Sequence, residues 1–414
     1  HLADVVLAFF QRHAPAAKGA FIVNSVATAY RLYGQLQPKL KAAGFVVGLN
    51  TGLTNEETRH TALESDLVIA TSTIDVGVDF RINFLIFESR DVGTFLQRLG
   101  RLGRHDDDGR GHTFAHFEAH ALLPNFLVER LFATDDAPLR DGAETVTREQ
   151  LSNAIRDKFP VPTQFQHYAQ HWGWVQAAHV VNELNNAKVR ANYEDARVRL
   201  KEHYWNLFHF SLNKKIFDLR DLPKPLKAEA SSFRGGSPFN VGLVDDTEGG
   251  TIKTYDLLTL ARNADLTWLD WEDFERLSDK RFSKSERERL IGAFRYRGML
   301  EERRKLILVL PALDATQFGQ AQVLEGIRLD LMPSVDWLNN LNYCLSRRHL
   351  VATLCRHDPD ELRVKLCLPP MFGLLPYQSP NGTGSIAFGR EGLLLYTALA
   401  NRPDLTRTSS AIFA

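Results

Sequence analysis

Short apolar runs alternate with amphipathic segments over the first third of the chain. Five runs are typical of buried strands: GAFIVN (19–24), FVVGLN (45–50), DLVIATS (66–72), INFLIFES (82–89) and GHTFAHFE (111–118). Helical patterns follow possible N-caps, among them Ser25 and, with capping-box spacing, Thr54 and Glu57. Unbroken apolar strands separated by helices predict a parallel sheet covered on both faces. We therefore expect an α/β domain over residues 1–132.

The pattern changes twice after residue 132. A polar, acidic link (133–144) leads to a helical region that begins at Thr147, which has capping-box spacing to Gln150, and runs to about residue 211. The rest of the chain is typical of loops and short strands, such as KLILVLPAL, GIRLDLM, RVKLCLPP and SIAFGREGLLLYTAL. The expected order is an α/β domain (1–132), a helical linker region (133–211) and a mixed α+β domain (212–414).

Polar residues follow three of the predicted strands at their carboxyl ends. They are Asn24 and Ser25, then Thr51 and Gly52, and finally Thr71 and Ser72. Ligands of open α/β sheets bind beyond the carboxyl ends of the strands. These residues therefore mark one half of a predicted binding site.

The segment FLQRLGRLGRH (95–105) carries an arginine at every third position, with glycines between them. Thr94 and Gln97 have capping-box spacing, which predicts a helix from Thr94 with the arginines in one stripe near its first turns. Each interior glycine costs a helix about 1 kcal/mol relative to alanine, so something is expected to approach this helix closely. Arginine is a planar, permanently charged donor suited to phosphate. A basic surface helix with incidental glycines is the alternative. The residues concerned are Arg98, Gly100, Arg101, Gly103 and Arg104.

Just upstream, the segment ATSTIDVGVDF (70–80) ends a predicted strand with two hydroxyl residues. Gly77 then permits a tight backbone, and Asp79 places a carboxylate beside it. A carboxylate close to phosphate-binding arginines can hold a ribose hydroxyl or orient a partner domain. An ordinary strand and turn is the alternative interpretation.

These segments together resemble four motifs of superfamily 2 helicases. QRLGRLGR looks like motif VI, ATSTIDVGVD like motif V and FIVNSVATA like motif IV, while GLNTGLTNEETR is similar to the threonine–glycine loop between the latter two. All four occur in the family's order over residues 19–104. The resemblance implies the second RecA-like domain of a helicase motor, that is, a parallel sheet flanked by helices.

The resemblance also implies roles for individual residues. The catalytic pair would be two arginine fingers that reach the γ-phosphate of ATP, Arg101 and Arg104. The ATP-binding residues would be Gly77, Asp79, at the ribose or the first motor domain, and Gln97. The phosphate backbone of a single strand would lie along Asn24, Ser25, Thr51, Gly52, Thr71 and Ser72. Hydroxyls and backbone N–H groups suit such contacts because phosphate contacts position a strand without reading its sequence.

Two signatures of a complete motor do not occur in the sequence. There is no GxxxxGKS or GxxxxGKT phosphate-binding loop, and no strand-borne DExH or DExD pair to hold Mg²⁺. The resemblance therefore implies that ATP and Mg²⁺ are held mainly by a first RecA-like domain outside this chain. This chain would supply half of an ATPase site and would be inactive alone.

Within the superfamily, FIVNSVATAYRL and GLNTGLT look most like the helicase of type I CRISPR interference, especially its type I-D form. The segments SSFRGGSP (231–238) and PPMFGLLPYQ resemble that subtype more loosely. The resemblance implies a single-stranded DNA translocase that is recruited to an RNA-guided surveillance complex in antiviral defence. HD occurs once, at His357-Asp358, without the further spaced ligands of a metal site. The HD nuclease is thus expected on another subunit, and no metal site is expected here.

Composition limits the kind of nucleic-acid site and the cellular compartment to be expected. The 414 residues carry a formal net charge of +0, so a nucleic-acid site would have to be a local groove. Three widely spaced cysteines favour a reducing cytoplasm, and no apolar run approaches the roughly 20 residues of a membrane span. The alternatives are another superfamily 2 RNA or DNA helicase of the DExH type, or a non-catalytic docking module with a RecA-like fold.

Three secondary features could also contact nucleic acid. The charged stretch 279–290, with Phe282, could guide a strand, although a solvated helix face is the more common outcome. Tryptophans such as Trp172, Trp174 and Trp205 could stack on bases but are more often core or interface residues. The polar loop 233–236 (FRGG) could reach a phosphate, or could form a plain turn.

Overall fold

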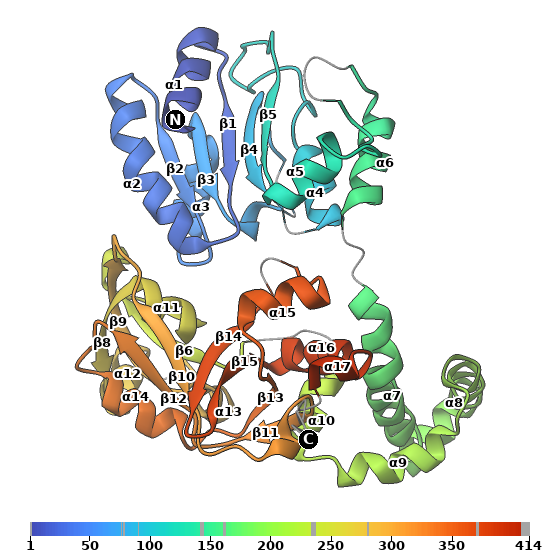
Figure 1. The fold of residues 1–414 in the computed structure, drawn as a ribbon. Helices are drawn as coiled ribbons and strands as arrows, with labels where there is room; N and C mark the ends of the chain where they lie inside the picture. The colour runs from blue at the N-terminus through green and yellow to red at the C-terminus, as the bar shows by residue number, and fades with distance from the viewer. Residues whose placement is uncertain are drawn as a thin grey trace, which may run out of the picture. The chain divides into compact units, whose positions relative to one another are not determined.

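The computed structural model describes nine segments of the chain: 2–75, 77, 79–89, 91–140, 145–159, 163–232, 237–279, 281–369 and 372–406. The predicted loop 233–236 lies outside them. The described chain forms two compact units (Figure 1). Unit 1 consists mainly of His1–Val161, and unit 2 contains most of the remainder. The predicted boundaries near residues 132 and 211 stay predictions.

Unit 1 is built on a five-stranded parallel sheet (Figure 1). Its strands lie in the order β2-β3-β1-β4-β5, with every pair parallel. The strands are β1 (Gly19–Ile22), β2 (Val47–Asn50), β3 (Leu67–Ala70), β4 (Phe84–Glu88) and β5 (Glu118–Leu122). The helices are α1 (Leu2–His13), α2 (Val26–Ala42), α3 (Glu56–Glu64), α4 (Val92–Leu99), α5 (Asn125–Phe132) and α6 (Arg148–Lys158).

Successive strand residues point to opposite faces of this sheet, and each face has its own core. Phe21 and Phe84 pack with α1 and α2 on one face. Ile22 and Phe87 pack with residues of α3 to α6 on the other. Since both faces are covered, unbroken apolar runs are the pattern that the strands require. The predicted parallel α/β class is therefore confirmed.

The strand predicted over 111–118 and the cap predicted for α3 are both wrong. The strand expected over 111–118 begins only at Glu118, because the preceding residues bond within their own loop: the Phe114 N–H donates to the Asp106 carbonyl at 2.8 Å. Helix α3 is capped by Asn55, not by Thr54, since the Asn55 side chain accepts the Thr58 N–H. The caps predicted at Ser25 and Thr147 are confirmed, the latter with a complete capping box.

Unit 2 combines helices with two sheets. The six-stranded sheet has the order β11-β13-β15-β14-β10-β12, and the four-stranded sheet the order β7-β6-β9-β8. The strands are β6 (Asn240–Asp245), β7 (Thr251–Asp256), β8 (Ala264–Leu269), β9 (Ala293–Met299), β10 (Lys305–Val309), β11 (Ala321–Leu324), β12 (Arg328–Met332), β13 (Leu350–Cys355), β14 (Leu375–Ser379) and β15 (Gly382–Phe388). The helices are α7 (Thr163–Leu184), α8 (Ala187–Phe208), α9 (Leu212–Asp221), α10 (Lys224–Ser231), α11 (Leu257–Asn263), α12 (Trp271–Leu277), α13 (Lys284–Arg289), α14 (Leu338–Leu345), α15 (Pro359–Leu366), α16 (Gly389–Ala400) and α17 (Pro403–Thr406).

The mixed α+β class predicted for this region is confirmed, with three differences in detail. Helices continue to Ser231, beyond the change of pattern expected near residue 211. The stretch 363–370 was expected as a strand, but α15 covers its first half because Asp358 caps a helix whose first residue is Pro359. The apolar run that ends SIAFGREGLLLYTAL is α16, which buries Leu393 and Leu395.

Candidate functional site

The predicted polar residues do meet at one edge of the parallel sheet. Ile22 is in register with Ala70, and Ala70 with Asn50, so the residues that follow β1, β3 and β2 leave the sheet side by side. Two hydrogen bonds join the loops there: the Thr71 N–H and the Thr73 hydroxyl both donate to the Asn50 carbonyl, at 3.1 and 3.0 Å. The carboxyl edge is therefore a connected surface.

The predicted strand-binding residues differ in exposure along this edge. Gly52 and Ser72 are exposed, whereas Thr51 and Thr71 are buried. The Thr51 hydroxyl accepts the Leu53 N–H at 3.2 Å, so it holds its own loop. Ser25 caps α2, and the Asn24 side chain binds an arginine of α4. Direct strand contact by any of the six stays a prediction, for which Gly52 and Ser72 are the most accessible.

The predicted arginine helix has a different start and end. The N-cap of α4 is Asp91, whose carboxylate accepts the Thr94 N–H at 2.8 Å, so the prediction of a start at Thr94 is wrong. The helix ends at Leu99 with Gly100 as C-cap, and Gly103 has φ +69° in the turn that follows. The expected stripe on one helix is therefore also wrong: Arg98 lies on α4, while Arg101 and Arg104 lie in the turn beyond it.

Arg98 is buried, with 1% of its surface exposed, and all of its nitrogens donate hydrogen bonds. Nε and Nη2 form a fork with the two carboxylate oxygens of Asp75, each at 2.9 Å. Nη1 donates to the Asn24 side chain at 3.0 Å and to the Glu88 carbonyl at 2.7 Å. Such a bidentate pair fixes direction as well as distance. Arg98 thus ties the ends of β1 and β4 to the segment that carries Asp75.

Through its backbone, Asp75 also contacts one predicted ATP-binding residue and one predicted catalytic residue. Its carbonyl accepts hydrogen bonds from Nε2 of Gln97 at 2.5 Å and from Nη2 of Arg101. Arg101 is only 5% exposed, whereas Arg104 is exposed and donates from Nε to the Gly100 carbonyl at 2.7 Å. The structure therefore brings Gln97, Arg101 and Arg104 together, around a residue that the sequence did not single out.

Two positive charges lie close together at this point. Burial lowers the pKa of Arg101, and the charge of Arg104 lowers it further, while Asp75 and Asp79 act in the opposite direction. The charged form of a half-desolvated guanidinium beside a second one is disfavoured. An anion placed between Arg101 and Arg104 would offset both effects.

Asp79 belongs to the same cluster. Nε2 of His105 lies 2.9 and 3.0 Å from its two carboxylate oxygens. This hydrogen bond holds the pKa of Asp79 below its ordinary value, so Asp79 is ionised near neutral pH. Gly77, with φ +79°, forms the turn two residues earlier. Asp79 is exposed and accessible to a hydroxyl donor such as a ribose.

Sequence reasoning missed Asp75, Glu88 and His105. Asp75 had a sequence signal, because it lies two residues before Gly77 just as Asp79 lies two residues after it. It could therefore have been considered as the partner of an arginine. Glu88 accepts the Asn24 N–H at 2.6 Å through its carboxylate and binds Arg98 through its carbonyl. The carbonyl contact has no sequence signal, because any residue supplies that group.

The described segments contain neither a metal-ligand cluster nor a helix suited to a membrane. No group of three or more His, Cys, Asp or Glu side chains there could hold a metal ion. His357 pairs with Glu361 at 3.1 Å, and Asp358 caps α15. Among the same residues, no helix has the length and apolar character needed to cross a membrane.

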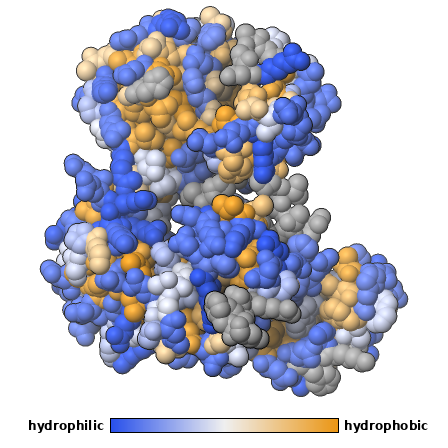
Figure 2. Space-filling model, in the orientation of Figure 1, coloured by the Kyte–Doolittle hydropathy of each residue, from blue (hydrophilic) through white to orange (hydrophobic). Residues whose placement is uncertain are grey.

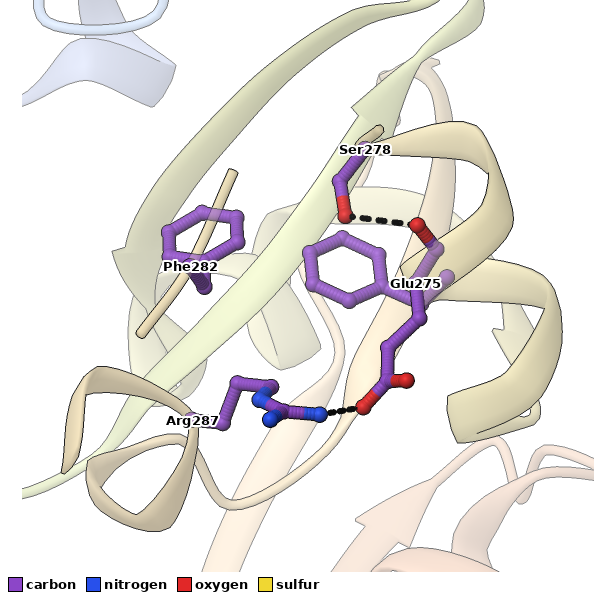
Figure 3. A pocket seen from close by; sticks show the side chains of 5 residues that line it. Glu275, Ser278, Phe282 and Arg287 are labelled. Carbon is purple, nitrogen blue, oxygen red and sulfur yellow. Dashed lines mark hydrogen bonds and ion pairs between the residues drawn. The ribbon is translucent and has the colours of Figure 1, made fainter. Parts of the chain in front are cut away.

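Unit 2 contains a small cavity of about 240 Å³, lined by Phe274, Glu275, Ser278, Phe282 and Arg287 (Figure 3). The rings of Phe274 and Phe282 stack with centroids 5.6 Å apart. The Arg287 guanidinium points toward the Glu275 carboxylate and pairs with it. Because these charges cancel, the cavity does not favour a phosphate. Phe282 packs against Phe274, which argues against the strand-guiding alternative considered for 279–290.

Comparison with known families agrees with the motif assignment. Residues 15–107 match the family model described as CRISPR-associated nuclease/helicase Cas3, C-terminal. No curated protein matches the chain. The matched range contains all four motif segments and the arginine cluster. It confirms the predicted similarity to the C-terminal part of a superfamily 2 helicase, here of the Cas3 kind; the type I-D form stays a prediction.

Solved structures are similar at low identity and low TM-score. A T. fusca Cas3 structure is 13% identical, with 59% of this chain and 29% of that chain covered, at a TM-score of 0.35. S. cerevisiae Dbp5 is 18% identical, with coverages of 37% and 42% and a TM-score of 0.24. A chain of a CRISPR RNA-guided surveillance complex is 16% identical, with coverages of 58% and 30% and a TM-score of 0.28. This chain therefore spans less than half of each of these relatives.

Proposed function

We propose that this chain supplies the C-terminal part of an ATP-dependent single-stranded DNA translocase that acts in CRISPR interference. The observation that carries the proposal is a cluster at the carboxyl edge of a parallel sheet, in which Gln97 and Arg101 bind the Asp75 carbonyl and the charges of Arg104 and Asp79 act on Arg101. The family match over residues 15–107 supports it.

In the proposed mechanism, Arg101 and Arg104 bind the γ-phosphate of ATP. Their mutual repulsion in the absence of an anion becomes attraction to the charge that develops during phosphoryl transfer. Asp79 accepts a ribose hydroxyl, and Gln97 holds the Asp75 backbone against the arginines. Mg²⁺, when bound, would neutralise phosphate charge, and a first RecA-like domain would hold it with most of the nucleotide.

The DNA strand is proposed to run along the carboxyl edge of the sheet, where Gly52 and Ser72 are exposed. Backbone and hydroxyl contacts there would follow phosphates without reading bases. The motor would act with an RNA-guided surveillance complex and an HD-nuclease subunit in the cytoplasm, as part of antiviral defence.

The test is ATP hydrolysis by the full-length protein with and without single-stranded DNA or RNA, for wild type, Arg101→Ala and Arg104→Ala. Arginine fingers accelerate hydrolysis about 10³- to 10⁵-fold, so both variants should lose DNA-stimulated turnover while still binding ATP. The matched control is Arg110→Ala. Arg110 is an exposed arginine of the next loop that pairs with Asp66 at 2.8 Å, and the control should keep full turnover.

Other outcomes separate the alternatives. Stimulation by RNA alone would favour a DExH-type RNA helicase. No turnover under any condition would overturn the motor and leave a docking module with a RecA-like fold.

A further inference from the structure

The tryptophans of the helical part of unit 2 fall into two groups. Trp172 is 7% exposed and packs in the core with α16, and Trp174 lies against the same core. Trp205, on α8, is 54% exposed. Figure 2 shows that apolar and hydrophilic residues mix on the surface of the α7–α8 hairpin. A tryptophan left in water is unusual, because its large apolar surface is normally buried.

Trp205 lines a pocket of about 490 Å³ between the end of α8 and the start of α9, within the range of small-ligand sites. The aromatic side chains Trp205 and Phe210 provide flat apolar surface, and Asn206 and Ser211 provide neutral hydrogen-bonding groups. The charged lining residues are Lys201 and Glu202. The pocket thus offers a stacking face next to polar atoms.

Lys201 gives this pocket its preference for an anion. Its side chain is half-buried, and it has no ion pair among the described residues. Burial lowers the pKa of Lys201, and Arg197 lowers it further. Arg197, in contrast, has a partner, because its Nε and Nη2 donate hydrogen bonds to the Glu194 carboxylate. An anion at Lys201 would therefore offset the free-energy cost of burying its charge, whereas the charge of Arg197 is already paired with Glu194.

We propose that the pocket around Trp205 binds one nucleotide of a single-stranded nucleic acid, with the base stacked on Trp205 and a phosphate at Lys201. One aromatic face beside one unpaired ammonium matches the repeat of a strand, which presents one base for each phosphate. Glu202, which also lines the pocket, counts against a densely charged acidic peptide. The site lies in unit 2 and is separate from the motif residues of unit 1.

The identity of the strand as DNA rests on the proposed function. The experiment uses the full-length protein without nucleotide and a fluorescein-labelled oligothymidylate, with the Kd read by anisotropy. Stacking on one aromatic residue corresponds to about a fivefold to 150-fold change in Kd. We therefore expect Trp205→Ala to weaken binding by that factor and Trp205→Phe to retain most of the affinity.

Lys201→Ala supplies a readout that a change in folding would not produce. Loss of one phosphate contact should reduce the slope of log Kd against log salt by about 0.7. The matched control is Tyr193→Ala, which removes an exposed aromatic residue of the same helix outside the pocket and should leave Kd unchanged.

The outcomes of this experiment distinguish a failure of this inference from a failure of the proposed function. Equal Kd values for wild type, Trp205→Ala and Lys201→Ala would overturn this inference, even if DNA stimulates ATP hydrolysis and the proposed function stands. Weakened binding by Trp205→Ala without DNA-stimulated hydrolysis in wild type would support the site and overturn the motor. A wild type that binds no oligothymidylate would overturn the site.

Discussion

Arg98 and Arg101 are three residues apart but meet opposite surroundings. Arg98 is enclosed by the Asp75 carboxylate, the Asn24 side chain and the Glu88 carbonyl. Nη2 of Arg101 donates to the Asp75 carbonyl, and the charge of Arg104 lies nearby. At the residue scale, the first arginine is a positioning residue and the second is the proposed phosphate ligand.

We predict that Arg98→Ala lowers the free energy of unfolding of unit 1 by about 3–5 kcal/mol, because it leaves the Asp75 carboxylate without its fork in a largely buried place. Denaturant unfolding measures the change. The control is Arg12→Ala, an exposed residue of α1, for which a change within about 0.5 kcal/mol is expected. A similarly small effect of Arg98→Ala would contradict the role assigned to this ion pair.

At the element scale, the end of α4 decides where the arginines point. Helix α4 stops at Leu99, and the chain turns through Gly103 at φ +69° before it reaches Arg104. Glycine suits this turn because residues with a side chain rarely adopt a positive φ. Close approach of another group is not the reason, since a Cβ added at Gly103 would meet nothing within 4 Å.

Gly103→Ala should therefore lower the free energy of unfolding by about 1–2 kcal/mol through backbone strain alone. Gly34 gives a matched comparison, because it lies exposed inside α2 with no positive φ and with free space around its Cβ position. Gly34→Ala should raise the free energy of unfolding by about 0.5–1 kcal/mol. Thermal and urea unfolding of both variants test the opposite signs, and equal signs would refute the explanation.

At the scale of the whole molecule, the two units have separate cores. Phe84 is fully buried between α1 and the sheet of unit 1, where its ring lies 4.5 Å from that of Phe9. Leu308 is fully buried in the six-stranded sheet of unit 2. Among the described residues, the core cluster that contains Phe84 consists of unit 1 side chains, so a packing defect there is expected to stay in unit 1.

We predict that Phe84→Ala costs unit 1 about 3–5 kcal/mol and that Leu308→Ala costs unit 2 about 2–5 kcal/mol, each by removing buried apolar contacts. Hydrogen exchange read by mass spectrometry should show lost protection in peptides of the substituted unit only. Uniform loss of protection across the chain would instead indicate a single cooperative unit.

Local chemistry made much of unit 1 predictable. The strands β1 to β4 lie within the apolar runs read from the sequence, because a strand buried on both faces needs an unbroken apolar segment. Ser25 and Thr147 cap their helices through contacts only three residues away. The four motifs and their order were equally visible, since each is a short contiguous segment.

The tertiary structure alone decided what depends on distant partners. Arg98 is buried because Asp75 and Asn24, 23 and 74 residues away, come together at the sheet edge. Spacing within one helix cannot distinguish such an arginine from Arg104, which stays in solvent. In the same way, Trp205 and Trp172 are alike in sequence, and only the packing of α7 and α16 buries one and leaves the other exposed. Burial is a property of the assembled chain, because it depends on which surfaces meet after the local elements have formed.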